Sequence, residues 1–234
     1  MPDGLPDVSA VIAALQKYYG KPAPPVTSDP FEQVLLEKSG YLTTDEKRER
    51  AFRELKKRVG TTPEKIRAAP MELLEEIAAI GGIYADTRAL RMKQSAELAL
   101  EDDPAAVVKL EFKQARKAIA KYPMIGEPGA EKILLFSGAH AVLGLESNGL
   151  RVVVRLGFGE EHKNYSTMYR GAQAALAPEI RAMNCARLIV AHQLLRRHGQ
   201  EICRRSDPGC DACPLNRDCR YAAKRQPARP AVLR

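Results

Sequence analysis

The sequence lacks several features that would place it in large classes of proteins. It contains no tryptophan, and aromatic residues make up only 6% of its 234 positions. No apolar run approaches the roughly 20 residues that a membrane-spanning helix needs. The first ten residues, MPDGLPDVSA, have no basic segment followed by an apolar one, and so do not form a secretory signal. We therefore expect a cytoplasmic protein with no membrane partner, in which thiols stay reduced.

Strand patterns and internal repeats are also missing. Apolar residues recur at helical spacing in one segment after another, and glycine follows most of these segments. The segment Arg151-Val-Val-Val-Arg155 is β-branched, but it is short and lies between helix-like segments. The sequence therefore predicts an all-α fold. Helices are expected near residues 8–19, 31–40, 45–60, 71–81, 85–100, 112–122 and 130–136, with a short one that Thr62 and Pro63 open.

Positive charge is concentrated towards the C-terminal end. The formal net charge is +8, and residues 187–234 hold eleven Lys or Arg against four Asp or Glu, a net charge of +7. A basic region of this kind indicates a polyanionic partner. The final ten residues, RQPARPAVLR, contain two prolines and no core-forming period. We expect residues 223–234 to be a disordered basic tail.

Four of the five cysteines lie in one short loop near the C-terminus. Cys203, Cys210, Cys213 and Cys219 are spaced C-x6-C-x2-C-x5-C. Four thiolates this close in sequence can bind either a structural zinc ion or a [4Fe-4S] cluster. Zinc sites usually combine two close pairs, whereas only Cys210 and Cys213 are so close here, and this favours the iron-sulfur cluster. The fifth cysteine, Cys185, falls in a helical apolar run and is expected to be a buried core thiol.

A turn containing glycine joins two of the expected helices. Pro123-Met-Ile-Gly-Glu-Pro-Gly129 follows one helix and precedes another at Ala130–Phe136. Gly126 and Gly129 would leave backbone N–H groups exposed at a helix start, and such groups bind phosphate without reading sequence. An ordinary connection between two helices fits the turn equally well.

Together and in this order, the motifs resemble one protein family. The P-M-I-G-E-P-G-A hairpin, an acidic residue at Glu146, the RVVVR helix and the C-x6-C-x2-C-x5-C loop are similar to the endonuclease III branch of the helix-hairpin-helix (HhH-GPD) DNA glycosylases. The I-G-G-I-Y stretch at residues 80–84 and the segment that precedes Cys203 also resemble parts of that family. The resemblance covers about residues 8–222.

The resemblance implies a two-lobed helical protein that works on DNA. Residues 28–140 would form a six-helix barrel with the hairpin, and residues 1–27 with 141–222 would form the iron-sulfur cluster domain. Double-stranded DNA with a damaged base would lie across the mouth between the lobes, and the damaged nucleotide would rotate out of the stack. We expect a monomer associated with the nucleoid. The resemblance and the basic charge suggest DNA contacts at Met124, Gly126, Gly129, Lys132, Arg204 and Arg205.

The position of the family's Schiff-base lysine departs from the pattern. In members that also cleave the strand, a hairpin lysine attacks the sugar, and the matching residue here is Pro128, which has no nucleophile. Lys132, one helical turn later, is better explained as a phosphate-contacting or solvated lysine. Met124 also replaces the first hairpin glycine. The lyase step is therefore not expected.

The catalytic aspartate of the family corresponds to Glu146, five residues before Arg151. Its carboxylate could stabilise the positive charge that develops as the base leaves and could orient a water molecule. The alternative is that Glu146 only caps the following helix. The segment where relatives carry a gap-filling glutamine has none, so the wedge would be Tyr41 or Leu42.

Three functions remain open from the sequence. The first is a monofunctional DNA N-glycosylase of base-excision repair with Glu146 as its catalytic carboxylate. The second is a catalytically silent DNA-binding or lesion-sensing protein on the same scaffold. The third is an iron-sulfur or zinc protein unrelated to DNA, such as an electron carrier.

Overall fold

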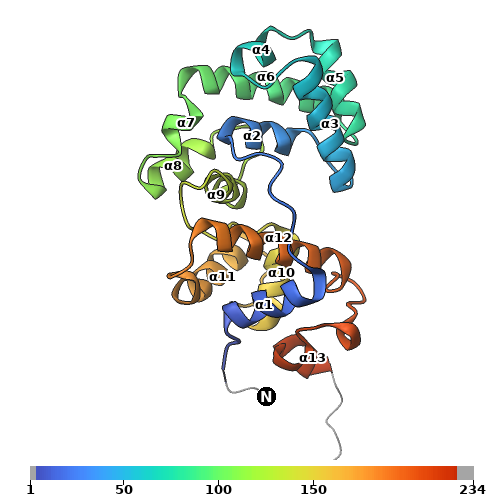
Figure 1. Cartoon of the computed structure of the whole chain (residues 1–234), viewed down its shortest axis with the longest axis vertical. Helices are drawn as coiled ribbons and strands as arrows, with labels where there is room; N and C mark the ends of the chain where they lie inside the picture. Colours follow the sequence, from blue (N-terminus) through green and yellow to red (C-terminus); the bar gives the residue numbers. More distant parts are fainter. Residues whose placement is uncertain (1–3, 226–234) are drawn as a thin grey trace, which may run out of the picture. The chain divides into compact units, whose positions relative to one another are not determined.

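The computed structural model describes residues 4–225, and every helix or strand element within that range is a helix (Figure 1). The prediction of an all-α fold is confirmed. The chain divides into two compact units, one of Pro24–Val142 and one that joins the segment up to Ala23 with the chain from Leu143 onward. The description of these units as a six-helix barrel and a cluster domain stays a prediction. The predicted disordered tail starts too early, since residues 223–225 belong to helix α13 (Arg220–Arg225), and the rest of it lies outside the described residues.

The Pro24–Val142 unit is built around one long helix. Helix α6 packs against α2, α4 and α5, and their apolar faces enclose a core that includes Phe52 and Met92, both almost fully buried. Burial of these faces is the main stabilising contribution to the unit. Its helices are α2 (Pro30–Lys38), α3 (Asp45–Arg58), α4 (Pro63–Ala68), α5 (Met71–Ile80), α6 (Ala85–Glu101), α7 (Pro104–Val107), α8 (Phe112–Ile119) and α9 (Glu127–Phe136).

Local capping explains where several of these helices start. The side-chain oxygens of Thr44 and Thr62 each accept a hydrogen bond from a backbone N–H three residues later. Helix α9 begins at Glu127, three residues before the expected start at Ala130, because proline is well suited to the first turn and Pro128 stands there.

The second unit is built around the packing of α10 against α12. Helix α10 buries Val152, Val153 and Val154, although β-branched residues are poor helix formers. Gly199 permits a close approach, because a Cβ there would lie 2.5 Å from the carbonyl oxygen of Asn148. The helices of this unit are α1 (Val8–Tyr19), α10 (Ser147–Leu156), α11 (Tyr165–Ile180), α12 (Cys185–Glu201) and α13 (Arg220–Arg225), with 3-10 turns η1 (Cys210–Ala212) and η2 (Asn216–Asp218).

One expectation about this unit is wrong. Cys185 is not a buried core thiol but the first residue of α12, where it is only partly buried. The side chain of Asn184 caps the helix immediately before it by accepting the N–H of Arg187. A helix start of this kind lies towards the surface, which the apolar run that follows did not indicate. Within residues 4–225, no helix has the length and apolarity required to cross a bilayer.

Candidate nucleic-acid interface and cysteine loop

The hairpin between α8 and α9 is a tight turn with a strained residue at its tip. The N–H of Ile125 donates to the carbonyl of Tyr122 at 3.0 Å, and Met124 within this turn has φ of 61°. This left-handed conformation favours glycine, the residue that Met124 replaces in the family pattern. The Met124 side chain is 70% exposed and so gains little burial in return. The turn therefore presents its tip to solvent.

The start of α9 offers backbone donors. Gly126 is the N-cap residue, and no side chain of the described range caps the helix there. The N–H groups of a first helical turn have no partner within the helix, and the helix dipole makes this end attractive to anions. The nearby carboxylate of Glu127 is neutralised by Arg116, whose Nη1 lies 2.6 Å from it. The N-terminus of α9 can therefore bind a phosphate.

Lys132 is engaged by a partner rather than solvated. Its ammonium group forms an ion pair and hydrogen bond with the carboxylate of Glu37. Burial raises the pKa of Glu37, but Lys132 outweighs this effect and lowers the pKa to about 2. The carboxylate therefore stays ionised at any physiological pH and remains a charged partner for the lysine. A direct DNA contact by Lys132 stays a prediction.

Two neighbouring loops expose large apolar side chains. Leu42 is 77% exposed and Tyr84 is 61% exposed, and both have left-handed backbones, with φ of 48° and 57°. Such conformations are costly for non-glycine residues and tend to occur at functional sites. Tyr41 and Ile83 beside them are also exposed. The two candidates for the wedge, Tyr41 and Leu42, thus both lie where they can reach a ligand.

The loop that carries Tyr41 and Leu42 and the loop that carries Ile83 and Tyr84 are fixed to each other by backbone contacts and by one buried arginine. The N–H of Tyr41 donates to the carbonyl of Gly81 at 3.0 Å, and a Cβ at Gly81 would lie only 1.7 Å from the carbonyl oxygen of Ser39. The guanidinium of Arg88 is almost fully buried. It donates to the carbonyls of Lys38, Ala78, Gly82 and Ile83. Because one cation ties both loops, the exposed side chains stand on a fixed base.

Glu146 is the N-cap of α10. Its Oε1 accepts the N–H of Gly149 at 2.7 Å, and its Oε2 accepts the side-chain amide of Asn148 at 2.8 Å. The capping alternative from the sequence is therefore observed, and it leaves the second lone pair of each carboxylate oxygen available. Burial and the nearby charge of Glu146 raise the pKa of Tyr165 to about 12, which keeps this phenol neutral.

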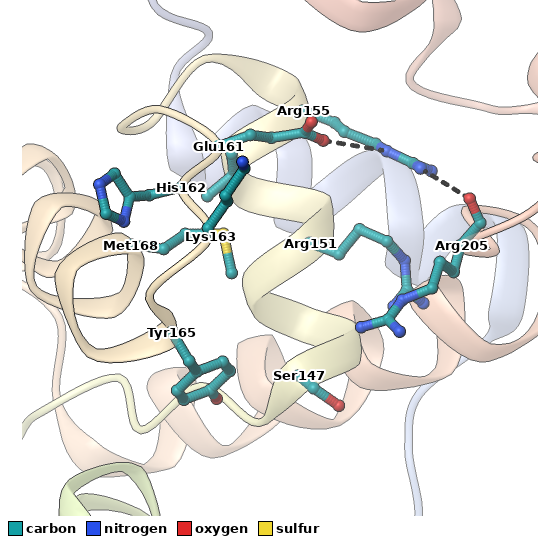
Figure 2. Close-up of a pocket in the computed structure, with 10 residues that line it drawn as sticks. Ser147, Arg151, Arg155, Glu161, His162, Lys163, Tyr165, Met168 and Arg205 are labelled. Atoms are coloured by element: carbon teal, nitrogen blue, oxygen red, sulfur yellow. Dashed lines mark hydrogen bonds and ion pairs between the residues drawn. The ribbon is translucent and has the colours of Figure 1, made fainter.

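A basic cavity of about 470 Å³ adjoins α10. Figure 2 shows Arg151 and Arg155 extending from α10 towards Arg205, while Ser147, the first residue of α10, and Tyr165, the first residue of α11, also line the cavity. Lys163 adds a further cation to the lining. The excess of cations gives the cavity a positive potential that suits phosphate groups.

The same two arginines clamp the start of the cysteine loop. Arg151 donates from Nε to the carbonyl of Cys203 at 2.7 Å. Arg155 donates to the carbonyl of Arg204 at 2.8 Å and places Nη1 3.4 Å from the sulfur of Cys203. The side chains of Arg204 and Arg205 are exposed, consistent with the phosphate contacts predicted for them.

The cysteine loop brings four thiols into electrostatic reach of one another. The pKa of the Cys213 thiol is raised to about 11, mainly by burial, with contributions in the same direction from Cys219, Cys203 and Cys210. Two of the sulfurs accept N–H groups, Cys213 from the backbone of Leu215 and Cys203 from the side chain of Arg155. The donor set therefore fits an iron-sulfur cluster.

In residues 4–225, no group of three or more His, Cys, Asp or Glu side chains converges closely enough to hold a single metal ion. None of the four cysteines forms a disulfide within the described residues. Their assignment as metal ligands, and the choice between a [4Fe-4S] cluster and zinc, stay predictions.

Comparison with known proteins finds similarity to DNA glycosylases in both sequence and structure. No protein-family model matches the sequence. Endonuclease III of Rickettsia prowazekii (strain Madrid E) is 27% identical over 107 residues, 45% of this chain, and the chain spans about half (46%) of that relative's length. A trapped endonuclease III–DNA covalent intermediate superposes with a TM-score of 0.72 at 19% identity, over 93% of this chain and 96% of the other. A thermostable thymine-DNA glycosylase superposes with a TM-score of 0.71 at 16% identity, over 93% and 97%.

These superpositions extend over nearly the whole of both chains. The chain has the helix-hairpin-helix DNA glycosylase fold. The resemblance that the sequence motifs indicated is therefore confirmed, and so is the fold that it implied.

Three structural residues of this glycosylase fold were not found from the sequence. Arg88 and Arg155 act through backbone carbonyls, and no sequence pattern marks such contacts. His198 is buried, with Nδ1 3.0 Å from the hydroxyl of Tyr19 and Nε2 3.4 Å from the sulfur of Cys213. Burial lowers the pKa of His198 to about 4, so the ring is neutral.

Proposed function

We propose that the chain is a monofunctional DNA N-glycosylase of base-excision repair, which flips a damaged or mismatched base out of double-stranded DNA and hydrolyses its N-glycosyl bond. The observation that carries this proposal is the pair of rigid loops that expose Tyr41, Leu42 and Tyr84. A loop with only a structural role would not keep strained backbones to hold apolar side chains in water. A glycosylase needs such side chains to fill the gap that an extruded base leaves.

DNA binding would rest on backbone donors and on surface cations. The N–H groups at the start of α9, at Gly126 and Gly129, would bind a phosphate, with Met124 at the tip of the turn beside it. Arg204 and Arg205 would bind further phosphates. Extrusion costs a few kcal/mol and costs least for a damaged base, which contributes to selectivity. Tyr41 or Leu42 would offset part of this cost by occupying the gap.

Glu146 would be the catalytic carboxylate. Gly149 and Asn148 hold its two oxygens in place, and each oxygen retains a lone pair for a water molecule or for the developing positive charge on the sugar. Tyr165 stays a neutral phenol near this carboxylate and can donate a hydrogen bond. The glutamate side chain is one methylene longer than that of aspartate and therefore has one more rotatable bond. The hydrogen bonds from Gly149 and Asn148 restrict this extra rotation.

Strand cleavage would not follow base removal. Pro128 stands in the first turn of α9 and has no nucleophile, and the amine of Lys132 is paired with Glu37. An amine held in an ion pair with a carboxylate is not free to attack the sugar carbon. The reaction would therefore stop at an abasic site.

The four cysteines Cys203, Cys210, Cys213 and Cys219 would hold a [4Fe-4S] cluster that cross-links the loop carrying Arg204 and Arg205. When bound, the cluster supplies structural rigidity to this loop. The chain's own residues, Arg151 and Arg155, fix the start of the loop against α10. We further propose a cytoplasmic monomer that associates with the nucleoid.

The proposal is tested with a panel of duplexes carrying uracil, oxidised and alkylated bases. The expected product is an abasic site that breaks only after alkali, with no adduct trapped by borohydride. Glu146→Gln should lower base release by about 100-fold or more while duplex affinity stays within threefold. Glu179→Gln, at an exposed position of α11, is the matched control and should leave base release and duplex affinity unchanged.

A second candidate function is favoured by the capping role of Glu146. If the carboxylate serves only the start of α10, the chain would be a DNA-binding or lesion-sensing protein without catalysis. Absence of base release across the panel, with duplex binding retained, would establish this alternative. Strand breaks without alkali would instead contradict the monofunctional assignment.

A further inference from the structure

A cavity of about 510 Å³ lies at the base of the exposed loops, within the Pro24–Val142 unit. Four of the side chains that line it are cationic, and one, Glu37, is a carboxylate that Lys132 already neutralises. The cationic side chains are Lys38, Arg48, Arg88 and Arg91. The guanidinium of Arg88 already donates to backbone carbonyls. Lys38, Arg48 and Arg91 are therefore the cations that remain to bind a ligand.

Lys38 is the most unusual of these cations. Its side chain is 3% exposed, and its Nζ has no hydrogen-bond partner among the described residues. A buried ammonium group without an acceptor is strongly unfavourable, whereas an apolar residue of the same length would pack there at no such cost. The position therefore has a donor in excess of what the fold requires.

Arg48 shows the same imbalance on the facing helix. Its Nε is buried without a partner, although its Nη1 lies 3.3 Å from the carboxylate of Asp45. Gly40 makes room for it, because a Cβ at that position would lie 2.8 Å from the Cβ of Arg48. Two cationic donors without hydrogen-bond partners thus line one cavity. Arg91 lies close enough for its charge to act on Lys38 as well. An anion with several acceptor oxygens would satisfy all three.

The mouth of the cavity has aromatic walls. The rings of Tyr41 and Tyr84 lie 5.9 Å apart between centroids, with 43° between their planes, and they are 46% and 61% exposed. Exposed tyrosine rings of this kind stack on nucleobases, whose faces all offer a π surface. Leu42 and Met124 complete the apolar part of the lining.

We propose that this cavity binds a nucleoside monophosphate unit, with the phosphate on Lys38, Arg48 and Arg91 and the base against Tyr41 or Tyr84. The unit could be a free nucleotide or an unpaired nucleotide within a DNA strand, since the two present the same groups. This binding site goes beyond the proposed function, because it needs neither cleavage of a glycosyl bond nor a duplex.

The test is calorimetric titration of the full chain at pH 7 with deoxyadenosine monophosphate, inorganic phosphate, deoxyadenosine and a single-stranded pentanucleotide. The monophosphate should bind at least tenfold more tightly than inorganic phosphate or the nucleoside alone, because only the monophosphate contacts both the cationic side chains and the tyrosine rings. Tighter binding of the pentanucleotide than of the monophosphate would assign the site to DNA, and the reverse would assign it to free nucleotides.

Variants separate the two halves of the site. Lys38→Met should weaken binding of the monophosphate at least tenfold, and Arg48→Gln should do the same if the first variant is poorly folded. Tyr84→Ser should weaken the monophosphate but leave inorganic phosphate unchanged. Lys57→Met removes the same charge from an exposed position on α3 outside the cavity and should change affinity by less than twofold.

The proposal is overturned if neither the monophosphate nor the pentanucleotide binds at millimolar concentration, or if Lys38→Met and Lys57→Met have equal effects. Duplex binding and base release are measured on the same preparations. If they persist without nucleotide binding, only this site is lost. If nucleotide binding persists without them, only the proposed glycosylase function is lost.

Discussion

At the scale of single residues, Lys38 and Met124 both carry a cost that the fold does not explain. Lys38 buries a charge without a partner, and Met124 adopts a backbone that suits glycine. Natural proteins keep such features mainly where a ligand uses them. Both residues line the same cavity, which is why we assign it a binding role.

The stability of the protein should depend on the ionisation of Lys38. Burial lowers the pKa of Lys38 from 10.5 to about 8, an effect that Glu37 opposes and Arg91 reinforces. The folded state thus disfavours the charged form, so the cost is fully present below pH 8 and is relieved as the pH rises towards 10.5. Lys38→Met should raise the free energy of unfolding by about 3 kcal/mol at pH 7 but only by about 1 kcal/mol at pH 9.5. Urea unfolding at both pH values measures this, and a loss of stability in the variant would show that Lys38 has a structural partner.

Met124→Gly should relieve backbone strain in the hairpin. A left-handed conformation costs an L-residue about 1–2 kcal/mol, and the greater entropy of unfolded glycine cancels part of that gain. We expect the free energy of unfolding to rise by up to about 1 kcal/mol. Met124→Ala keeps the strain and should match the wild type. Equal stability of the glycine and alanine variants would contradict the strain.

At the scale of elements, the contact between α10 and α12 depends on one glycine. Gly199→Ala would force the backbones apart, because the new Cβ would lie 2.5 Å from the carbonyl oxygen of Asn148. Overpacking of this kind typically costs about 1–3 kcal/mol, and thermal unfolding should show the loss. Gly171→Ala in α11 is the matched control, since its Cβ would meet nothing within 4 Å, and it should be neutral or stabilising. Comparable destabilisation by both variants would mean that the helical glycines, rather than this contact, are responsible.

At the scale of the whole molecule, the cysteine loop should determine metal content and DNA binding together. The purified protein should be brown and contain about four irons per chain. Cys219→Ser should lose the iron and weaken duplex binding, because the loop that carries Arg204 and Arg205 would no longer be cross-linked. Cys185→Ser should keep both, since this cysteine lies outside the loop. Zinc in place of iron would contradict the cluster assignment.

Most of the helices were predictable because their signals are local. Thr44 and Thr62 are caps that act within three residues, and apolar spacing marks the faces that α2 and α6 bury. The early start of α9 and the surface position of Cys185 were missed. Both depend on how a segment meets its neighbours at a helix end, which spacing alone does not record.

The sequence by itself determined the all-α class, the four-cysteine loop and the positions of the hairpin and of Glu146, because composition, spacing and turn chemistry are local properties. Only the tertiary structure decided that Lys132 is paired with Glu37, that Arg88 ties two loops and that Lys38 is buried without an acceptor. These facts join residues from different helices, or concern what surrounds one side chain. Burial and pairing are properties of the packed chain, and no pattern along the sequence specifies them.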